Sequence, residues 1–409
     1  MRWSKIAQGS TFYVAYLIVA VFVLGELATR AVFACEVGPR VLAYGTAWYR
    51  NVNPDEDARR DRQTWEDPEF KGRLAAHLSA EKRSDSVERH RNNQGQYTKF
   101  FPGEHKTTRD VDTGERLPVT INREGFRGAQ FDRNKAPGTT RVLTLGASST
   151  FGFYNRDHET YPHQLALALN EACPEKAFEV INFAIPHSSS GNIAALLRAE
   201  GIALQPDAIT FYQGRNDSVL PDEPAGVLEK LYAVTVHRFM LVAFLDQLLV
   251  GERTSVVAAS EKFEPRAERT TQYYLGNLDD VLAVSREHNV LLVVANQQAT
   301  SAAPYPRAAP EREPLRGRTY AAEAAEIRKR IEHNETVTSF EYSLLIHQRL
   351  MQRLAVWAQT NQVPFVDVMS ALDHDRHLLL SWVHLHPEAN KVIAAELAKP
   401  LLDEFCGGR

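Results

Sequence analysis

Short apolar runs alternate with helical stretches over the C-terminal part of the chain. The apolar runs cover residues 141–147, 178–185, 208–214, 289–296 and 364–369, and the helical stretches cover 161–173, 192–204, 271–288, 339–360 and 387–405. Nearly continuous apolar strands separated by helices are typical of a parallel sheet with helices on both faces. We therefore expect an α/β fold, a three-layer α/β/α sandwich with a mostly parallel five-stranded sheet.

Two segments lengthen the spacing between these elements. Residues 218–265 follow the third predicted strand and residues 299–338 follow the fourth, and we expect the Pro- and Arg-rich part of the second segment, 304–318, to be a loop. Sheets of this kind bind ligands beyond the carboxyl ends of their strands. We expect both insertions to form excursions around a site at that edge.

The chain before the predicted sheet has a different pattern. Residues 55–91 mix acidic and basic side chains evenly, which favours a solvated connector or an exposed helix. Residues 94–137 are rich in Gly, Thr and Asp with short alternations, which favours turns and short strands. The predicted organisation is an N-terminal membrane anchor over 1–34, a charged connector and lead-in over 35–140, and the α/β domain over 141–409.

The N-terminal stretch predicts the compartment. Residues 6–25 carry no charged side chain, and about twenty helical residues span the hydrocarbon core of a bilayer. Arg2 and Lys5 precede the stretch, so the positive-inside rule places the N-terminus of this single-pass transmembrane helix in the cytoplasm and the rest of the chain in the periplasm or outside the cell. A signal peptide cleaved after Ala34 is the alternative, although Arg30 before that cut favours an uncleaved anchor. Both interpretations make the bulk of the protein extracytoplasmic.

Composition and charge exclude several classes of protein. With 44% hydrophobic and 24% charged residues the chain is an ordinary globular protein rather than a disordered or fibrous one. The formal net charge of -4 gives it no overall attraction to nucleic acid. Three cysteines exclude both a disulfide-dense scaffold and a four-cysteine zinc site.

The cysteine positions leave one disulfide as an option. Cys173 ends the helix after the first predicted strand, and Cys406 ends the last helix. In a doubly wound sheet whose first and last helices share a face, those two ends can come together, and an oxidising compartment would keep the bond. We expect a bridge between Cys173 and Cys406 with Cys35 left over; three unrelated thiols are the alternative.

Three polar clusters carry the candidate chemistry. The first predicted strand ends in Gly146-Ala147-Ser148-Ser149-Thr150-Phe151-Gly152, the third ends in Gly214-Arg215-Asn216-Asp217, and Ser381-Trp382-Val383-His384-Leu385-His386 precedes the last helix. A serine at a tight strand-to-helix turn lies beside a helix N-terminus, which stabilises negative charge. An asparagine amide fixed at a strand end can donate to an oxyanion, and a histidine can act as a general base. Taken singly, the clusters are two turns and a structural histidine, and the first lacks the Gly-Lys-Ser/Thr ending of a P-loop.

Together and in this order, the clusters resemble the SGNH (GDSL-like) hydrolase family. The blocks match at Gly146, Ser148, Thr150 and Gly152, then at Gly214, Asn216 and Asp217, and finally at Val383, His384, Leu385, Pro387, Glu388 and Asn390. The segment 120–127 is similar to the lead-in of membrane-anchored bacterial members. The resemblance covers about residue 141 to the C-terminus and implies the flavodoxin-like fold of that family.

The resemblance also implies a role for each matched residue. Ser148 would be the nucleophile and His384 the base, and Asn216 would stabilise the oxyanion together with the Ser148 backbone N–H, with Gly214 in support. It implies no cofactor and no metal. The run from residue 373 to 377 contains Asp and His, but zinc sites need a defined ligand spacing and the sequence shows no second cluster.

Two departures from the family pattern bear on the mechanism. His187 stands where the family has an oxyanion glycine, so a backbone N–H survives without glycine's conformational freedom. Ser381 occupies the position of the acid that orients the histidine, and loss of that acid from a protease triad costs about 10⁴-fold in turnover. Asp373 and Asp375 lie just upstream and are candidates to reach His384 from the preceding loop.

Two classes of function are consistent with these residues. An acyl-transfer enzyme would form an acyl-serine on an ester or acylated glycan and resolve it with water, as an esterase, or with a sugar hydroxyl, as an O-acyltransferase of envelope polysaccharide. The alternative is a catalytically impaired binding or assembly subunit of a membrane-associated complex, with a membrane protein as its partner. His187 and Ser381 favour the second class, whereas the retained serine, asparagine and histidine favour the first.

Overall fold

The computed structural model describes a defined part of the chain. The described residues are 16–32, 87–92, 95–100, 105–110, 113, 115–219, 239, 241–242, 245, 260–301, 315–333, 335 and 337–407. The chain divides into two compact units, Met1–Ser84 with Asp222–Arg253 and Asp85–Pro221 with Thr254–Arg409. The second unit holds the sheet and every predicted site residue.

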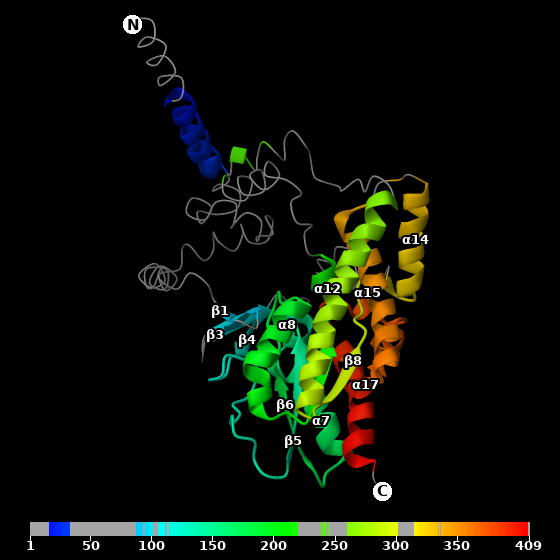
Figure 1. Cartoon of the computed structure of the whole chain (residues 1–409). Coiled ribbons are helices and arrows are strands. Elements are labelled where there is room, and N and C mark those ends of the chain that lie inside the picture. Colours follow the sequence, from blue (N-terminus) through cyan, green and yellow to red (C-terminus); the bar gives the residue numbers. More distant parts are fainter. Residues whose placement is uncertain are drawn as a thin grey trace, which may run out of the picture. The chain divides into compact units, whose positions relative to one another are not determined.

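Five parallel strands form the predicted sheet. They are β5 (Thr139–Gly146), β6 (Ala177–Asn182), β7 (Ala208–Tyr212), β8 (Leu291–Ala295) and β9 (Phe365–Val366), in the order β6-β5-β7-β8-β9. Figure 1 labels β5, β6 and β8 of this sheet. Every neighbouring pair is parallel, so the prediction of a mostly parallel five-stranded sheet is confirmed. The strand order reverses between β5 and β7, and doubly wound sheets bind ligands in the crevice at such a switch point.

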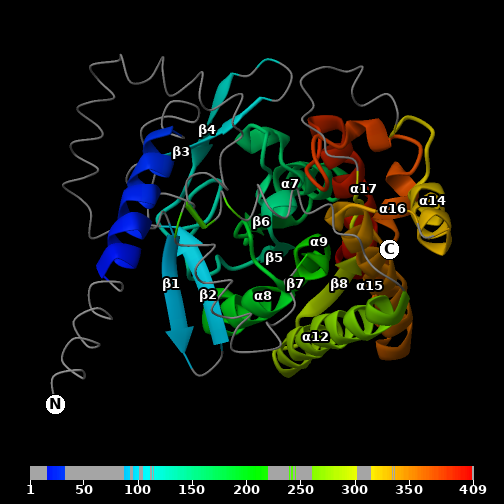
Figure 2. The ribbon, with the colours of Figure 1, turned by 90° about the horizontal axis from the view of Figure 1, so that it is seen from above.

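Helices cover both faces of the sheet. One face carries α8 (Ser190–Leu196), α12 (Ser260–Glu287) and α15 (Ser339–Asn361), and the other carries α7 (Tyr161–Ala172), α16 (Val368–Leu372) and α17 (Pro387–Cys406) (Figure 2). Side chains alternate along each strand, so Leu143 and Leu145 of β5 pack on the first face and Val142 packs on the second. The three layers agree with the predicted sandwich.

The predicted helices form with shifted bounds. α7, α15 and α17 lie within one or two residues of their expected ranges, whereas α12 begins at Ser260, inside the first predicted insertion. The expected helix over 192–204 is α8 followed by a π turn, Leu197–Gly201, and a 3-10 turn, Ile202–Leu204. The described part of the second insertion contains α14 (Tyr320–Glu332), whose first turn is capped by the Thr319 side chain. Residues 220–238 and 302–314 of the two insertions lie outside the described residues.

Two antiparallel hairpins precede the sheet. β1 (Val87–Asn92) pairs with β2 (Gly95–Phe100), and β3 (His105–Arg109) pairs with β4 (Arg116–Thr120). Short strands were expected over 94–137, but β1 corrects the expectation of a connector or helix up to residue 91, because the charged residues 87–92 pair with β2 as an antiparallel strand. The rest of that run, 55–86, lies outside the described residues.

The first unit contains a described helix over residues 16–32. Arg30 Nε donates to Glu26 Oε1 at 2.8 Å within this helix, and Leu241 N donates to Glu26 Oε2 at 2.8 Å. Among the described residues, no helix combines the length and the apolar character that crossing a membrane requires. Residues 6–15 of the expected anchor lie outside the described residues, and the anchor stays a prediction.

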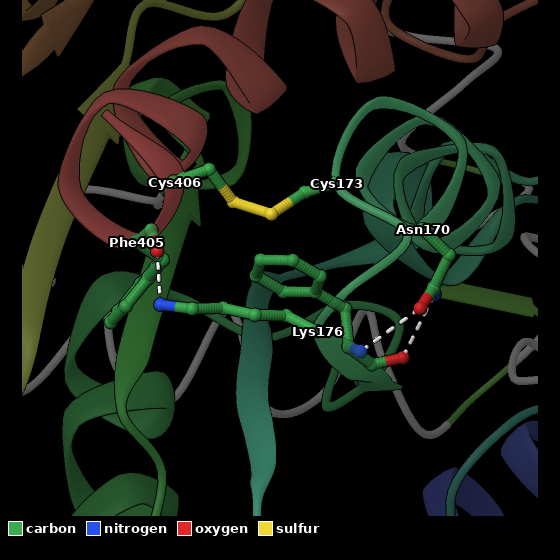
Figure 3. Close-up of a disulfide and its surroundings, with 6 residues drawn as sticks. Asn170, Cys173, Lys176, Phe405 and Cys406 are labelled. Atoms are coloured by element: carbon green, nitrogen blue, oxygen red, sulfur yellow. Dashed lines mark hydrogen bonds between the residues drawn. A yellow bond between two sulfur atoms is a disulfide. The ribbon is translucent and has the colours of Figure 1, made fainter. Parts of the chain in front are cut away.

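The expected disulfide joins the ends of α7 and α17. Cys173 and Cys406 are bonded with 6.4 Å between their Cα atoms, which confirms the predicted pairing (Figure 3). Lys176 Nζ donates to the Phe405 carbonyl beside the bridge. Asn170 exchanges two hydrogen bonds of 3.0 Å with the backbone of Phe178. The helix that follows Ser148 is therefore fastened covalently to the helix that follows His384.

We predict that the Cys173→Ser, Cys406→Ser double variant loses about 3–5 kcal/mol of unfolding free energy, because the bridge closes a very long loop in the unfolded chain. Chemical denaturation without reductant measures this loss, and dithiothreitol should reproduce it in the unaltered protein. Cys35→Ser removes the remaining cysteine and is the matched control, with no change expected. Equal denaturation midpoints for the double variant and the unaltered protein would contradict the prediction.

Candidate active site

Ser148 lies in a tight turn at the carboxyl end of β5. It is the first residue of the short helix α6 (Ser148–Phe151), and its side chain is nearly buried. A Cβ atom on Gly146 would lie 1.9 Å from Thr150 Oγ1, so the approach of the strand to the helix requires glycine. Gly152 ends the helix with φ 94°, a left-handed conformation that glycine adopts at little cost. The two glycines thus hold Ser148 at a helix N-terminus over the switch point of the sheet.

Hydrogen bonds join the three polar clusters. Ser149 Oγ donates to the Val383 carbonyl at 2.8 Å, which connects the first cluster to the third. Arg215 N donates to Gln297 Oε1 at 2.7 Å, and Gln297 Nε2 lies 3.5 Å from Ser149 Oγ, which connects the second cluster to the first. Gln297 follows β8, so the ends of three adjacent strands and the loop before α17 meet in one place.

Ser148, Asn216 and His384 are each the sequence neighbour of a residue in this network. The structure therefore brings the three predicted residues to one site. Ser148 and His384 are not hydrogen-bonded to each other, because His384 Nε2 is buried without a partner and Nδ1 contacts Ser381. Hydrogen bonds of this kind often tighten only when substrate binds.

Asn216 belongs to α9 (Arg215–Ser218), the short helix after β7, which Gly214 precedes. Asn216 Nδ2 donates to the Ser188 carbonyl at 2.9 Å, and Gln213 Nε2 donates to the same oxygen at 3.1 Å. An amide carries two N–H groups, so the second one on Asn216 can donate to a ligand. The asparagine thereby serves the loop that carries His187 as well as the site.

Asp217 is a buried anchor of that loop. Its carboxylate accepts from Ser190 Oγ at 2.6 Å, from Ser190 N at 3.0 Å and from Gln213 Nε2 at 3.1 Å. Burial raises the pKa of Asp217, and the hydrogen bonds from Ser190 and Gln213 oppose this shift. The acidic residue of the second matched block therefore positions the loop through Ser190 and Gln213.

His187 adopts the conformation of the glycine it replaces. Its φ is 63°, in the left-handed region that glycine enters freely and other residues rarely enter. His187 lacks glycine's conformational freedom, and the hydrogen bonds to the following residues hold the loop in this conformation. The His187 N–H keeps its place in the loop, while the imidazole is exposed.

His384 is enclosed between a serine and two aromatic rings. Ser381 Oγ lies 2.5 Å from His384 Nδ1, so Ser381 stands where an orienting acid would stand. The Phe153 and Tyr154 rings pack edge-on against the imidazole, with centroid distances of 5.4 Å and 5.2 Å. Tyr154 has φ 69° and its N–H donates to Thr108 Oγ1 at 2.9 Å, which fixes this wall of the site.

This enclosure keeps His384 neutral. Burial, together with a smaller electrostatic effect of His187, lowers the pKa of His384 to about 3. A hydroxyl at position 381 supplies no negative charge to offset the burial. The imidazole can accept a proton only transiently, which is what a general base does during a reaction.

Asp373 and Asp375 do not approach His384. Asp373 Oδ1 accepts from Tyr320 N at 2.6 Å and so binds the start of α14, and Asp375 lies 3.9 Å from His377 Nδ1. The expectation that one of them reaches His384 is wrong, because Nδ1 contacts Ser381 and Nε2 has no partner. Within the described part of the chain, no three His, Cys, Asp or Glu side chains gather as a metal site would require.

A buried ion pair supports the loop after β8. Arg376 and Glu323 are in contact and almost completely buried. Glu323 Oε1 accepts from Ser301 N at 2.9 Å and from Thr300 Oγ1 at 3.0 Å. Thr300 N then donates to the Trp382 carbonyl at 2.9 Å, two residues before His384. The ion pair therefore helps to set the position of the histidine loop.

A pocket of about 300 Å³ adjoins this ion pair. Charged side chains of Arg318, Arg330 and Glu341 line it together with Phe340. Phe340 stacks on Trp382 with 4.2 Å between the ring centroids. The pocket thus lies next to the loop that carries His384.

Sequence reasoning missed several of these supporting residues. Gln297 belongs to a polar run directly after a buried strand, a signal that could have identified it. Phe153 and Tyr154 follow Gly152 and could have been suspected as the wall of the turn. Glu323 and Arg376 are surrounded by many other charged residues, and nothing in the sequence separates them from surface positions.

Comparison with known proteins gives similarities to solved structures. Neither a protein-family model nor a curated protein matches the chain. A GDSL-like lipase from Bacteroides thetaiotaomicron is 11% identical with a TM-score of 0.36, and the match covers 65% of this chain and 89% of that one. A catalytic mutant of an acetylxylan esterase from Geobacillus stearothermophilus is 12% identical with a TM-score of 0.35, covering 63% of this chain and 92% of that one.

We predict that His384 stays neutral well below pH 6.5 and that a carboxylate at position 381 raises its pKa, because a negative charge favours the imidazolium. An NMR titration should give a low midpoint for the unaltered protein and for Ser381→Ala, and a clearly higher one for Ser381→Asp. Since the unfolded imidazole protonates first on acidification, the contribution of neutral His384 to stability is present above pH 6.5 and decreases as the pH falls toward 3. A midpoint near 6.5 in the unaltered protein would contradict the prediction.

We predict that Glu323→Gln lowers the free energy of unfolding by about 3–5 kcal/mol, because it leaves the Arg376 guanidinium buried without its counter-charge. The matched control is Glu326→Gln, which breaks an ion pair with Arg318 in which the Glu326 side chain is 62% exposed. That control should cost less than about 1 kcal/mol. Urea denaturation measures the free energy of unfolding of both variants. Equal losses of unfolding free energy would show that the buried ion pair stabilises the fold no more than the exposed one.

Proposed function

We propose that this chain is a serine esterase or acyltransferase of the SGNH type, in which Ser148 is the nucleophile and His384 is the general base. The observation that carries the proposal is the union of the three clusters through the Ser149 to Val383 hydrogen bond and the contacts of Gln297 with Arg215 and Ser149. It supports a site in which Ser148, at the start of α6, is paired with His384, whose buried Nε2 has no hydrogen-bond partner among the described residues. Such a constellation is suited to nucleophilic attack on an acyl group.

The proposed reaction proceeds in two balanced steps. Ser148 Oγ bonds to the carbonyl carbon of the ester while its proton moves to His384 Nε2, and that proton then passes to the leaving alcohol as its C–O bond breaks. Water or a sugar hydroxyl then attacks the acyl-serine and gives its proton to Nε2. That proton passes to Ser148 Oγ as the bond between Oγ and the acyl carbon breaks, which restores the serine and the neutral histidine with the acyl group transferred. The Asn216 amide and the backbone N–H groups of Ser148 and His187 donate to the carbonyl oxygen when it carries negative charge.

Because Ser381 stands in place of an acid, we expect the proposed reaction to be slow. The hydroxyl near Nδ1 can orient the ring, but it cannot stabilise the imidazolium as a carboxylate does. The low pKa of His384 makes the imidazole a weak base, although it keeps the base unprotonated over a wide pH range. We therefore expect the enzyme to have a low turnover number but to keep its activity at acidic pH.

The proposed substrate is a short-chain ester, such as an O-acetyl group on envelope polysaccharide. Ser148 is only 9% exposed, which favours a small acyl group over a long one. An extracytoplasmic location is supported by the Cys173–Cys406 bridge, because such bonds persist in oxidising compartments. The uncharged N-terminal stretch supports attachment to the membrane.

The second candidate function is a binding or assembly subunit that keeps the fold without the chemistry. Two observations favour it: no carboxylate contacts His384, and no hydrogen bond links His384 to Ser148 in the described structure. In that case the site would bind an acylated glycan, and a membrane protein would be the partner.

We predict that a fluorophosphonate probe labels the folded protein at one site per molecule and that Ser148→Ala abolishes labelling, because the probe reacts with an activated serine. Mass spectrometry of the labelled peptide identifies the residue. Ser370→Ala, at an exposed serine of α16, is the matched control and should label normally. Folded protein that fails to label would favour the binding subunit over the enzyme.

A further inference from the structure

Arg215 carries a positive charge inside the protein, one residue before the proposed oxyanion donor Asn216. The residue is only 4% exposed. Burial lowers the pKa of Arg215 to about 10, so the guanidinium stays charged at neutral pH. Charged side chains are almost never buried unless a group of opposite charge accompanies them. The groups around Arg215 therefore decide whether its charge is compensated.

The partners of the Arg215 guanidinium are neutral. Nη1 donates to Ser343 Oγ at 2.8 Å and to Ser218 Oγ at 3.3 Å. Nη2 is buried and has no hydrogen-bond partner. Among the described residues, no carboxylate forms an ion pair with this side chain. Two hydroxyl groups can orient the guanidinium, but they supply no negative charge.

The buried carboxylates of this part of the chain are bound to other groups. Glu323 is in contact with Arg376, and both side chains are almost completely buried. Asp217 lies two residues after Arg215, but its carboxylate accepts from the backbone and the hydroxyl of Ser190. The positive charge of Arg215 therefore has no counter-charge of its own in the described part of the chain.

The histidine beside this segment adds no charge either. A Cβ atom on Gly214 would lie 3.2 Å from His347 Nε2, so the imidazole packs against the residue that precedes Arg215. Its Nδ1 lies 2.8 Å from the Tyr320 hydroxyl, and its Nε2 has no partner. Burial, together with a smaller electrostatic effect of Arg215, lowers the pKa of His347 well below its usual value. The imidazole is therefore neutral.

The start of α9 connects the charge of Arg215 to the candidate active site. Arg215 N donates to Gln297 Oε1 at 2.7 Å, and Asn216 is the next residue. Since consecutive Cα atoms lie about 3.8 Å apart, the guanidinium lies on the order of 10 Å from the Asn216 amide. A unit charge at about that distance in a medium of effective dielectric constant about 20 changes the binding of an anion by roughly tenfold.

We propose that Arg215 stabilises negative charge in the candidate active site, and that the site therefore binds an anion more tightly than a neutral molecule of the same shape. This inference rests on the proposed function, in which the anion is the oxyanion formed when Ser148 attacks an ester. Arg215 is a positioning residue, because it acts through its charge and through Asn216 without touching the substrate. Unpaired buried charge destabilises a fold, and ionisable groups in such environments concentrate at functional sites.

The test measures the binding of acetate and acetamide, which have nearly the same shape and differ by one charge. Each is titrated at neutral pH and constant ionic strength while the NMR signal of the His384 ring is followed. Arg215→Met removes the charge, so the affinity for acetate should fall about tenfold while the affinity for acetamide stays the same. Arg215→Lys keeps the charge and should retain most of the acetate affinity. Arg353→Met, at an arginine of α15 whose side chain is 48% exposed, is the matched control and should change neither affinity.

Three results of this titration would overturn the proposal. An unchanged acetate affinity in Arg215→Met would show that the charge does not act on the site. Equal losses for acetate and acetamide would show that Arg215 only braces α9, and a lack of acetate binding to the unaltered protein would refute the anion preference. If Arg215→Met does not fold, Arg215→Gln replaces it. The Gln and Lys variants both lose the guanidinium but differ in charge, so equal acetate affinities in these two would refute the proposal.

The hydrolysis of p-nitrophenyl acetate separates this inference from the proposed function. The charge stabilises the oxyanion and not the neutral ester, so Arg215→Met should lower kcat about tenfold and leave KM unchanged. A raised KM with an unchanged kcat would contradict the inference and leave the enzyme standing. If the unaltered protein hydrolyses no ester but loses acetate affinity in Arg215→Met, the proposed enzyme fails and the anion preference stands.

Discussion

The hydrogen bond from Ser149 Oγ to the Val383 carbonyl is the contact on which the site depends. It is buried, 2.8 Å long, and joins residues separated by 234 positions in the chain. Ser149 is fixed by the turn after β5, and Val383 lies in the loop just before α17. Because both groups are removed from water, losing either partner would leave the other unsatisfied. The serine and the histidine are therefore held in register by their neighbours and not by each other.

Burial has a second consequence at His384. A histidine that must accept a proton is usually helped by a carboxylate, and this protein has a hydroxyl and two aromatic rings instead. The rings exclude water, which penalises the charged imidazole, while the serine fixes the direction of the ring. In the proposed mechanism Ser381 orients His384 but supplies no negative charge to stabilise the imidazolium. We therefore expect the proposed reaction to depend on the oxyanion donors more than on the base.

The sequence was sufficient to predict the sheet and to identify the polar clusters at the ends of its strands, because both depend on local patterns. The apolar runs marked the five strands, and the polar residues at their ends marked Ser148 and Asn216. Contacts between distant parts of the chain could not be predicted from the sequence. No local pattern indicates that Asp373 binds the start of α14 or that Glu323 pairs with Arg376. The start of α12 was missed because its first turns are polar and contain Pro265. The disulfide could be predicted because three cysteines and one shared helix face left few pairings.

The bridge between Cys173 and Cys406 also determines the consequence of cleaving the backbone of this protein. The two cysteines lie 233 positions apart, and nearly everything that follows the serine turn, including the His384 loop, is enclosed between them. A peptide bond cut in any loop inside that interval yields two polypeptides that are still one covalent molecule. The serine-bearing piece and the piece ending in α17 stay attached beside the sheet edge formed by β6. Proteolysis in such a loop would therefore produce a nicked protein whose two halves cannot diffuse apart until the disulfide is reduced.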